Sequence, residues 1–294
     1  MAIKVLILWA TGSIGVAVAA EMAAHGHEVI ALARSASAAE ALKAKGYEIL
    51  HGDLLRPAEW ADAIRTVEAV IHVAATFDDD MEVVDRNLIT TLIAAAGSTE
   101  RPIRFVHTGG CWLYGATGDQ VATEAMPFDP IPAFEWAIET ANMLVASAAF
   151  CTAIIHPAMV YHKGGGVLSG FMEDAKAGRP VALWGPTKTR WPLIHRDDLA
   201  VAYRLLAEQT DLTGHFNAVS EVSVPIGDIA EAIGAAMDLP LEFKNRDIDA
   251  SISELGSWAE GMFLDQQMDC PRLIAEAGWS AKITDYRASD VFES

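Results

Sequence analysis

The chain is poor in positive charge. Its 294 residues hold 21 Lys and Arg against 40 Asp and Glu, which gives a formal net charge of −19. So acidic a chain repels phosphate backbones and anionic lipids, which argues against nucleic acid and membrane surfaces as partners. It also lacks an apolar run of the roughly 18 residues that span a bilayer, and a secretory signal before its first predicted strand. We expect a cytoplasmic protein whose partner is a small molecule.

Cysteine is scarce as well. Cys111, Cys151 and Cys270 are far apart and odd in number, and no C-x-x-C pair occurs. This pattern predicts neither a disulfide framework nor a zinc knuckle. The acidic run Asp78-Asp79-Asp80 precedes a predicted helix, where it suits the positive end of the helix dipole better than a metal. We therefore expect no metal site.

Apolar residues make up 52% of the chain, enough for a large core, and they follow an alternating pattern. Runs that are apolar on both faces predict strands at Ile3–Leu8, Glu28–Ala33, Tyr47–Gly52, Ala69–Ala74, Ile103–Thr108 and Thr152–Met159. Between them lie predicted helices at Ile14–His25, Ala36–Lys45, Pro57–Thr66, Met81–Gly97 and Phe134–Phe150. Buried strands that alternate with helices indicate an α/β fold, a doubly wound parallel sheet covered on both faces.

The pattern changes after residue 160. Pro and Gly become more frequent, and the predicted elements are shorter: Val181–Gly185, Asp197–Glu208, His215–Val219, Ile226–Met237 and Leu241–Lys244. We interpret residues 161–294 mostly as a smaller C-terminal lobe that caps a substrate. A segment at about 195–220 is expected to return to the main sheet, with Asp197–Glu208 as its helix.

The first strand leads into a glycine turn, Trp9-Ala10-Thr11-Gly12-Ser13-Ile14-Gly15, and then into an alanine-rich helix. Strand, tight turn and helix in this order are typical of dinucleotide binding, with the helix amides facing a pyrophosphate. The expected spacing is G-x-x-G-x-x-G, and Trp9 stands where the first glycine lets the backbone lie against the cofactor. The indole would displace the cofactor, reposition it or stack on part of it. Residues 1–160 are thus predicted to form a dinucleotide-binding domain, with Trp9, Thr11, Gly12, Ser13, Ile14 and Gly15 at the cofactor.

Further cofactor contacts are predicted where later strands end. Arg34 closes the second strand near the expected adenosine ribose, and an arginine suits a 2′-phosphate. NADP is therefore favoured over NAD, which stays possible. Asp53 and Leu54 follow the third strand, beside the adenine, and Ala74 and Ala75 follow the fourth, where small side chains let the cofactor pass.

Together these elements resemble the extended short-chain dehydrogenase/reductase superfamily, in its NAD-dependent epimerase/dehydratase group. The resemblance covers nearly the whole chain through the order and spacing of short motifs: Thr11-Gly12-x-x-Gly15, Gly52-Asp53-Leu54, His72-Val73-Ala74-Ala75, Asn87, Leu113-Tyr114-Gly115, His156-Pro157-Ala158-Met159-Val160-Tyr161, His195-Arg196-Asp197-Asp198-Leu199-Ala200 and Ala277-Gly278-Trp279. It implies a Rossmann-type domain with Pro157 at the cofactor. It also implies a homodimer that pairs through helices at Glu82–Ala96 and Phe134–Phe150.

The catalytic positions depart from this family. Its members carry a Ser or Thr after the fifth strand and a Tyr-x-x-x-Lys pair on the next helix, whose tyrosine exchanges a proton with the carbonyl. Gly110, Trp136 and Thr140 occupy these three positions here. An indole does not titrate and a threonine carries no charge, so the usual proton relay is absent. The sequence predicts an atypical active site.

Five residues are candidates to replace the relay. His107 and His156 lie on the fifth and sixth strands and could carry protons near neutral pH. Cys111 could act if its pKa were lowered, and Thr108 and Tyr161 end the two strands close to the expected nicotinamide. For each of them a structural role, such as a hydrogen-bonded histidine or a buried inert thiol, is the alternative.

Tryptophan gives the last indication. Trp112, Trp136, Trp184 and Trp191 could line one cavity for a flat or apolar ligand, or they could be scattered through the core.

Three functions stay open. The first is an NAD(P)-linked oxidoreductase or epimerase-type enzyme for a small, aromatic or apolar carbonyl or hydroxyl compound, favoured by the resemblance, Arg34 and Asp53. The second is an isomerase, lyase or cyclase without hydride transfer, favoured by tryptophan at two functional positions. The third is a non-catalytic regulator that binds a nucleotide or another ligand, favoured by the empty relay positions.

Overall fold

The computed structural model describes residues 1–75, 77–78, 80–97, 101–239 and 242–292. Asp79, in the acidic run, and Leu241, at the start of the last predicted segment, lie outside the described residues. Within those ranges, no helix is both long enough and apolar enough to cross a bilayer.

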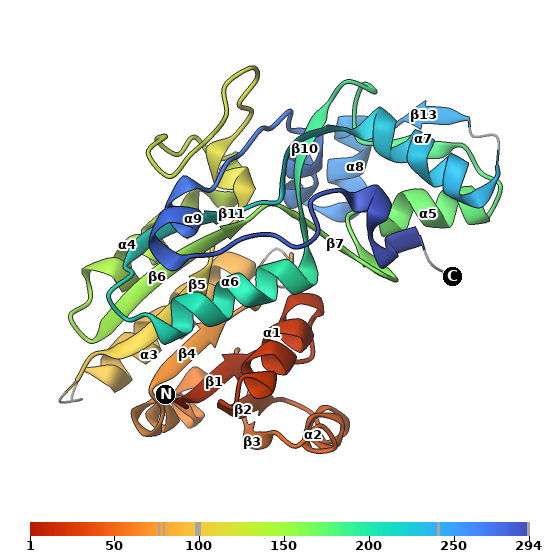
Figure 1. Cartoon of the computed structure of the whole chain (residues 1–294). Coiled ribbons are helices and arrows are strands. Elements are labelled where there is room, and N and C mark those ends of the chain that lie inside the picture. Colours follow the sequence, from red (N-terminus) through yellow and green to blue (C-terminus); the bar gives the residue numbers. More distant parts are fainter. Residues whose placement is uncertain (76, 79, 98–100, 240–241, 293–294) are drawn as a thin grey trace.

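A seven-stranded sheet forms the centre of the molecule (Figure 1). Its order is β11-β6-β5-β4-β1-β2-β3, and each neighbouring pair is parallel. The predicted α/β fold with a Rossmann-type parallel sheet is confirmed. In chain order the strands are β1 (Lys4–Leu8), β2 (Glu28–Ala33), β3 (Glu48–His51), β4 (Ala69–His72), β5 (Ile103–Thr108), β6 (Phe150–Pro157) and β11 (Gly214–Ala218).

Helices cover both faces of this sheet, because its central strands bury apolar side chains on each side. On one face α1 (Ser13–Ala24) packs against α6 (Arg196–Glu208), and on the other α3 (Met81–Ala96) packs against α4 (Glu135–Ala146) (Figure 1). Helix α2 (Ala36–Lys43) packs on β2 and β3 at the sheet edge.

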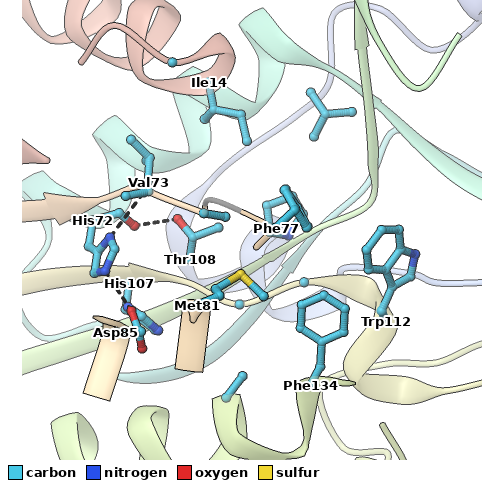
Figure 2. Close-up of a pocket in the computed structure, with 18 of the residues that line it drawn as sticks. Ile14, His72, Val73, Phe77, Met81, Asp85, His107, Thr108, Trp112 and Phe134 are labelled. Atoms are coloured by element: carbon cyan, nitrogen blue, oxygen red, sulfur yellow. Dashed lines mark hydrogen bonds and ion pairs between the residues drawn. The ribbon is translucent and has the colours of Figure 1, made fainter. Parts of the chain in front are cut away.

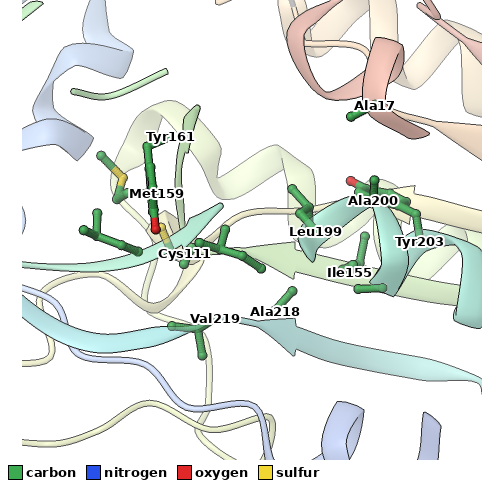
Figure 3. Packing of buried hydrophobic residues seen from close by; sticks show 14 of the residues in the cluster. Ala17, Cys111, Ile155, Met159, Tyr161, Leu199, Ala200, Tyr203, Ala218 and Val219 are labelled. Carbon is green, nitrogen blue, oxygen red and sulfur yellow. The ribbon is translucent and has the colours of Figure 1, made fainter. Parts of the chain in front are cut away.

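The core under α1 and α6 brings distant parts of the chain together. Figure 3 shows Ala17 of α1 opposite Ala200 of α6, with Ile155 of β6 and Ala218 of β11 in the same cluster. Small alanine side chains let the two helices approach closely. Residues 196–218 therefore pack with the first half of the chain, while the domain boundary at residue 160 stays a prediction.

One predicted helix is wrong. Residues 57–66 form two 3-10 helices, Pro57–Glu59 and Ala61–Thr66, instead of one α-helix. Between them Trp60 has φ −136° and ψ −10°, and its buried indole donates a hydrogen bond to the Asp53 carbonyl at 2.9 Å. This tertiary anchor overrides the helical pattern of the sequence.

The predicted strand Thr152–Met159 is divided between two sheets. β6 ends at Pro157, whose nitrogen carries no hydrogen for a strand ladder, and β7 (Met159–His162) pairs with β10 instead. The chain thus leaves the central sheet at Ala158, one of the residues at the cavity described below.

The C-terminal part adds a four-stranded sheet of order β12-β10-β7-β8 and a two-stranded parallel pair, β13-β9. The strands are β8 (Gly165–Gly166), β9 (Val181–Leu183), β10 (Arg190–His195), β12 (Glu221–Pro225) and β13 (Phe243–Asn245). The helices are α5 (Ser169–Lys176), α7 (Ile226–Met237), α8 (Ile248–Leu255) and α9 (Pro271–Ala277), with 3-10 helices at Cys111–Tyr114, Pro132–Phe134, Ser257–Phe263, Tyr286–Ala288 and Asp290–Phe292.

Candidate active site

A cavity of about 410 Å³ lies at the carboxyl ends of β1, β4 and β5, between the start of α1 and the helices α3 and α4. This is where open parallel sheets bind ligands. Its lining is mostly apolar, and its aromatic side chains are Trp9, Phe77, Trp112, Phe134 and Trp136. Its ionisable side chains are Cys111 and three that Figure 2 labels, His72, Asp85 and His107.

Trp9 adopts the backbone conformation of the glycine that it replaces. Its φ of 72° lies in the left-handed region, which residues other than glycine rarely adopt. The Trp9 carbonyl leaves no room for a Cβ on Gly15, so the close approach of turn and helix is kept. The Trp9 indole lies over Gly12, with its Cδ1 atom 2.9 Å from the position that a Gly12 Cβ would take. The turn is intact, and an aromatic ring covers its middle.

The predicted cofactor residues divide into two groups. Those that line the cavity are Trp9, Gly12, Ser13, Ile14, Leu54, Ala74, Ala75 and Pro157. In the described part of the chain, those outside the lining are Thr11, Gly15, Arg34 and Asp53.

The surroundings of the turn explain this division. Arg34 is exposed after β2, and the Asp53 carboxylate accepts a hydrogen bond from the Leu55 amide at 3.0 Å. Gly12 is the N-cap of α1, and within the described structure no side chain caps that end, so the first amides of the helix can face an anion.

None of the three relay positions offers a titrating group. Gly110 is extended, with open space where a Cβ would stand. The Trp136 indole donates to the Ala133 carbonyl at 2.9 Å. The buried Thr140 hydroxyl donates to the Ala137 carbonyl at 3.2 Å.

Three of the five predicted replacements, Thr108, His107 and Cys111, line the cavity. The Thr108 hydroxyl donates to the His72 carbonyl at 2.6 Å, and its oxygen lies 2.5 Å from the Tyr203 hydroxyl, so it has no proton to spare for a ligand. Burial raises the pKa of the Cys111 thiol to about 12, which makes it inert.

The other two candidates lie elsewhere; among the described residues neither His156 nor Tyr161 lines the cavity. His156 is fully buried behind Gly110, whose amide donates to its Nδ1 at 3.3 Å, and its Nε2 lies 2.9 Å from His215. Tyr161 is also fully buried and donates to Glu221 at 3.4 Å.

The predicted convergence of four tryptophans is wrong for two of them. Trp112 and Trp136 line the cavity, whereas Trp184 and Trp191 are outside its described lining. Trp184 packs edge-on against Phe263 at 5.4 Å, and Trp191 stacks on Phe171 at 5.8 Å. The fold places both in the core of the C-terminal part, which sequence spacing could not reveal.

Phe77 and Phe134, which the sequence did not indicate, join Trp112 instead. Their ring centroids lie 6.2 Å and 5.4 Å from that of Trp112. The buried Trp112 Nε1 has no hydrogen-bond partner among the described residues.

The site also contains a polar cluster of three residues, of which the sequence had indicated His107 alone. His72 ends β4, and Asp85 lies on α3. His107 lies on β5, directly beside His72 in the parallel pairing of β4 with β5. His72 Nε2 lies 2.9 Å from Asp85 Oδ1, and the two histidine rings meet edge-on with centroids 5.1 Å apart (Figure 2). The Ala74 amide donates to His72 Nδ1 at 3.2 Å, which places the His72 proton on Nε2, toward Asp85.

Burial controls the charge of this cluster. It lowers the pKa of His107 to about 4, so the ring is neutral at neutral pH. Burial opposes ionisation of Asp85, but the hydrogen bond from His72 and the neighbouring histidines outweigh it, and the Asp85 pKa is below its usual value. Asp85 Oδ2 and His107 Nδ1 are buried and have no hydrogen-bond partner within the described structure.

The fold and cavity define an α/β protein with a Rossmann-type sheet and a ligand site at its carboxyl edge. A sequence model of the NAD dependent epimerase/dehydratase family matches residues 5–219. The chain belongs to this family, which confirms the resemblance seen in the sequence.

Two curated relatives that match most of the chain are yeast proteins. Uncharacterized protein YLL056C of Saccharomyces cerevisiae is 26% identical over 97% of this chain and 98% of its own length. Uncharacterized protein C2A9.02 of Schizosaccharomyces pombe is 27% identical over 81% of this chain and 82% of its own.

Solved structures share the fold at low identity. Human epimerase family protein SDR39U1 with NADPH superposes with a TM-score of 0.77 at 19% identity and covers 99% of both chains. The dTDP-glucose 4,6-dehydratase of Bacillus anthracis in complex with NAD has a TM-score of 0.81 at 14% identity, covering 99% of this chain and 96% of its own.

Proposed function

We propose that this chain is a nicotinamide dinucleotide-linked oxidoreductase or epimerase-type enzyme that acts on a small carbonyl or hydroxyl compound with an apolar or aromatic body. The observation that carries the proposal is the position of the cavity, which lies between the uncapped start of α1 and the ends of β4 and β5. Family membership and the NADPH and NAD in the titles of similar structures support it.

The turn fits a pyrophosphate in every respect except the Trp9 side chain. The amides at the start of α1, the small Ala74 and Ala75, and Pro157 border one continuous space. The indole over Gly12 covers the surface that the backbone would offer to a pyrophosphate, so binding requires the ring to turn aside or to stack on the cofactor. NADP is favoured over NAD because Arg34, exposed directly after β2, offers a guanidinium suited to a 2′-phosphate.

A bound nicotinamide ring would supply or accept the hydride. The chain itself orients the substrate and excludes water, for which the aromatic walls of Trp112, Phe134 and Trp136 are suited. Trp112 Nε1, buried without a partner among described residues, can donate a hydrogen bond to a substrate oxygen.

Titration of the purified protein with NADPH and NADH, followed by nucleotide fluorescence, tests this proposal. We expect saturable binding of both, tighter for NADPH, and NADPH consumption with aromatic aldehydes such as benzaldehyde. Failure to bind either nucleotide would contradict the proposal.

One observation favours a second function, an isomerase, lyase or cyclase without hydride transfer. The Trp9 ring covers the turn while the tyrosine and lysine positions are held by Trp136 and Thr140. This candidate predicts that small aromatic ligands bind the cavity while neither nucleotide binds. The titration with NADPH and NADH separates the two functions, because only the first requires a nucleotide to bind.

A further inference from the structure

Two histidine–carboxylate pairs in the described part of the chain share one close geometry, with the histidine buried in each. In each, a backbone amide donates to histidine Nδ1 at 3.2 Å, and Nε2 lies 2.9 Å from a carboxylate oxygen. One pair is His27 with Glu208, the other His72 with Asp85, and both histidine side chains are 3% exposed.

The pairs differ at the second carboxylate oxygen. Glu208 Oε2 accepts a hydrogen bond from Arg204 at 2.8 Å, so this pair is complete and lies outside the cavity lining in the described structure. Asp85 Oδ2 has no such donor in the described structure, although it is buried at the cavity. A buried carboxylate oxygen without a donor is costly, so the missing partner is expected to come from a ligand.

We propose that His107 and Asp85 form the proton-exchanging group of this cavity, with His72 as the residue that positions Asp85, and that their ligand carries a hydroxyl on an apolar or aromatic body. This inference rests on the proposed function only for its hydride step. The binding of a hydroxyl by Asp85 and His107 stands without it.

The cluster lies beside the positions where the family pair is missing. Trp136 lines the same cavity as Asp85, and Thr140 is close enough to Asp85 to help lower its pKa. The positions where the family carries a tyrosine and a lysine are thus bordered by a carboxylate and two histidines.

The proton step can be followed atom by atom. The substrate hydroxyl donates its hydrogen bond to Asp85 Oδ2; when the O–H bond breaks, the proton passes through this carboxylate to His107, and the Asp85 carboxylate then stabilises the resulting imidazolium. A dinucleotide bound as in the proposed function would supply the oxidant: it would accept the hydride from the substrate carbon, so that the alcohol becomes a carbonyl compound. In the reverse direction His107 returns the proton to the substrate oxygen.

A metal ion is a competing occupant, since ligand atoms of His72, Asp85 and His107 lie within 4.8 Å of one another. The His72 tautomer argues against it. A metal on Nε2 would move the ring proton to Nδ1, which already faces the donating Ala74 amide.

The test compares Asp85→Asn with Glu208→Gln, which neutralises the complete pair and serves as the matched control. Calorimetry measures the affinity of each folded variant for benzyl alcohol and for toluene, which lacks the hydroxyl. We expect the wild type and Glu208→Gln to prefer benzyl alcohol, and Asp85→Asn to lose about tenfold of that preference, because a hydrogen bond to a charged group is lost. Affinity for toluene should stay the same.

An unchanged preference in Asp85→Asn would overturn the assignment, and so would a wild type that does not distinguish the two ligands. Stoichiometric zinc or iron in the purified protein that is lost in Asp85→Asn would show a metal site instead. None of these measurements needs a nucleotide, so failure of the proposed redox function is recognised separately, by a missing response to NADPH.

The role of His107 is tested by turnover. His107→Gln should bind benzyl alcohol but oxidise it with NADP at least about a hundredfold more slowly than the wild type, as for loss of a general base. A His72→Gln variant should retain part of the rate, because His72 only positions Asp85. Wild-type turnover in His107→Gln would overturn the proton-transfer role.

Discussion

At the scale of single residues, Trp9 has a strained backbone, and its indole covers the cofactor turn. A left-handed backbone costs a residue other than glycine about 1–2 kcal/mol, and the indole lies over Gly12. The strain persists because β1 and α1 hold the turn from both sides.

Two variants separate these effects. Trp9→Gly removes both the strain and the ring, whereas Trp9→Ala removes only the ring. We expect both to bind NADPH several-fold more tightly than the wild type, and only Trp9→Gly to gain in melting temperature. Nucleotide fluorescence and thermal unfolding measure the two effects, and unchanged NADPH affinity in both variants would show that the ring does not obstruct the site.

Glu221 links stability to pH. Burial raises its pKa to about 7 from the ordinary 4.5, while it accepts hydrogen bonds from Tyr161 and the Tyr286 amide. The folded state therefore binds the proton more tightly than the unfolded state, so this residue's contribution favours folding below pH 4.5 and declines as pH rises to about 7.

We expect Glu221→Gln to raise the melting temperature at about pH 8 and to lose that advantage near pH 4. Thermal unfolding across this range checks the sign. A gain that is the same at both ends would show that Glu221 does not titrate as described.

The positions of site residues that are neighbours in the chain were predictable from the sequence. The positions of site residues that meet only through folding were not. Gly12, Ser13 and Ile14 line the cavity because a turn fixes their positions locally. His72 and Asp85 meet only because α3 packs across the end of β4, and the spacing between them carries no such signal.

At the scale of elements, α4 carries the altered catalytic positions. Thr140 is fully buried on it, next to Asp85. A lysine at this position would bring an ammonium group to the free Asp85 oxygen, in place of the ligand hydroxyl.

We expect Thr140→Lys to fold with a higher melting temperature than Thr140→Met, which has similar length but no charge. Thr140→Lys should also lose about tenfold in affinity for benzyl alcohol. Equal melting temperatures for the two variants would indicate that the added ammonium does not reach Asp85.

Most element positions followed from hydrophobic patterning. β2, β5 and α7 have the predicted bounds. Strands and helices that bury apolar faces can be located because their apolar residues recur with the period of the element. The errors fall where contacts from outside the segment decide, at the anchored Trp60 and at the change of sheet after Pro157.

At the scale of the whole molecule, we propose a homodimer formed by α3 and α4. Both helices expose apolar side chains, with Val83 69% and Val145 46% accessible. Native mass measurement should give a dimer, and Val83→Glu should shift it toward monomer by burying a charge in the interface. A monomeric wild type at all concentrations would contradict this proposal.

We propose that, in the molecule as a whole, one cavity joins a dinucleotide turn to the His107–Asp85 proton group. Reduction of benzaldehyde with NADPH by the wild type, Asp85→Asn and Glu208→Gln tests both parts at once. We predict turnover by the wild type and Glu208→Gln, and a rate about a hundredfold lower in Asp85→Asn. Equal rates in all three proteins, or no NADPH-dependent reduction by the wild type, would contradict the account.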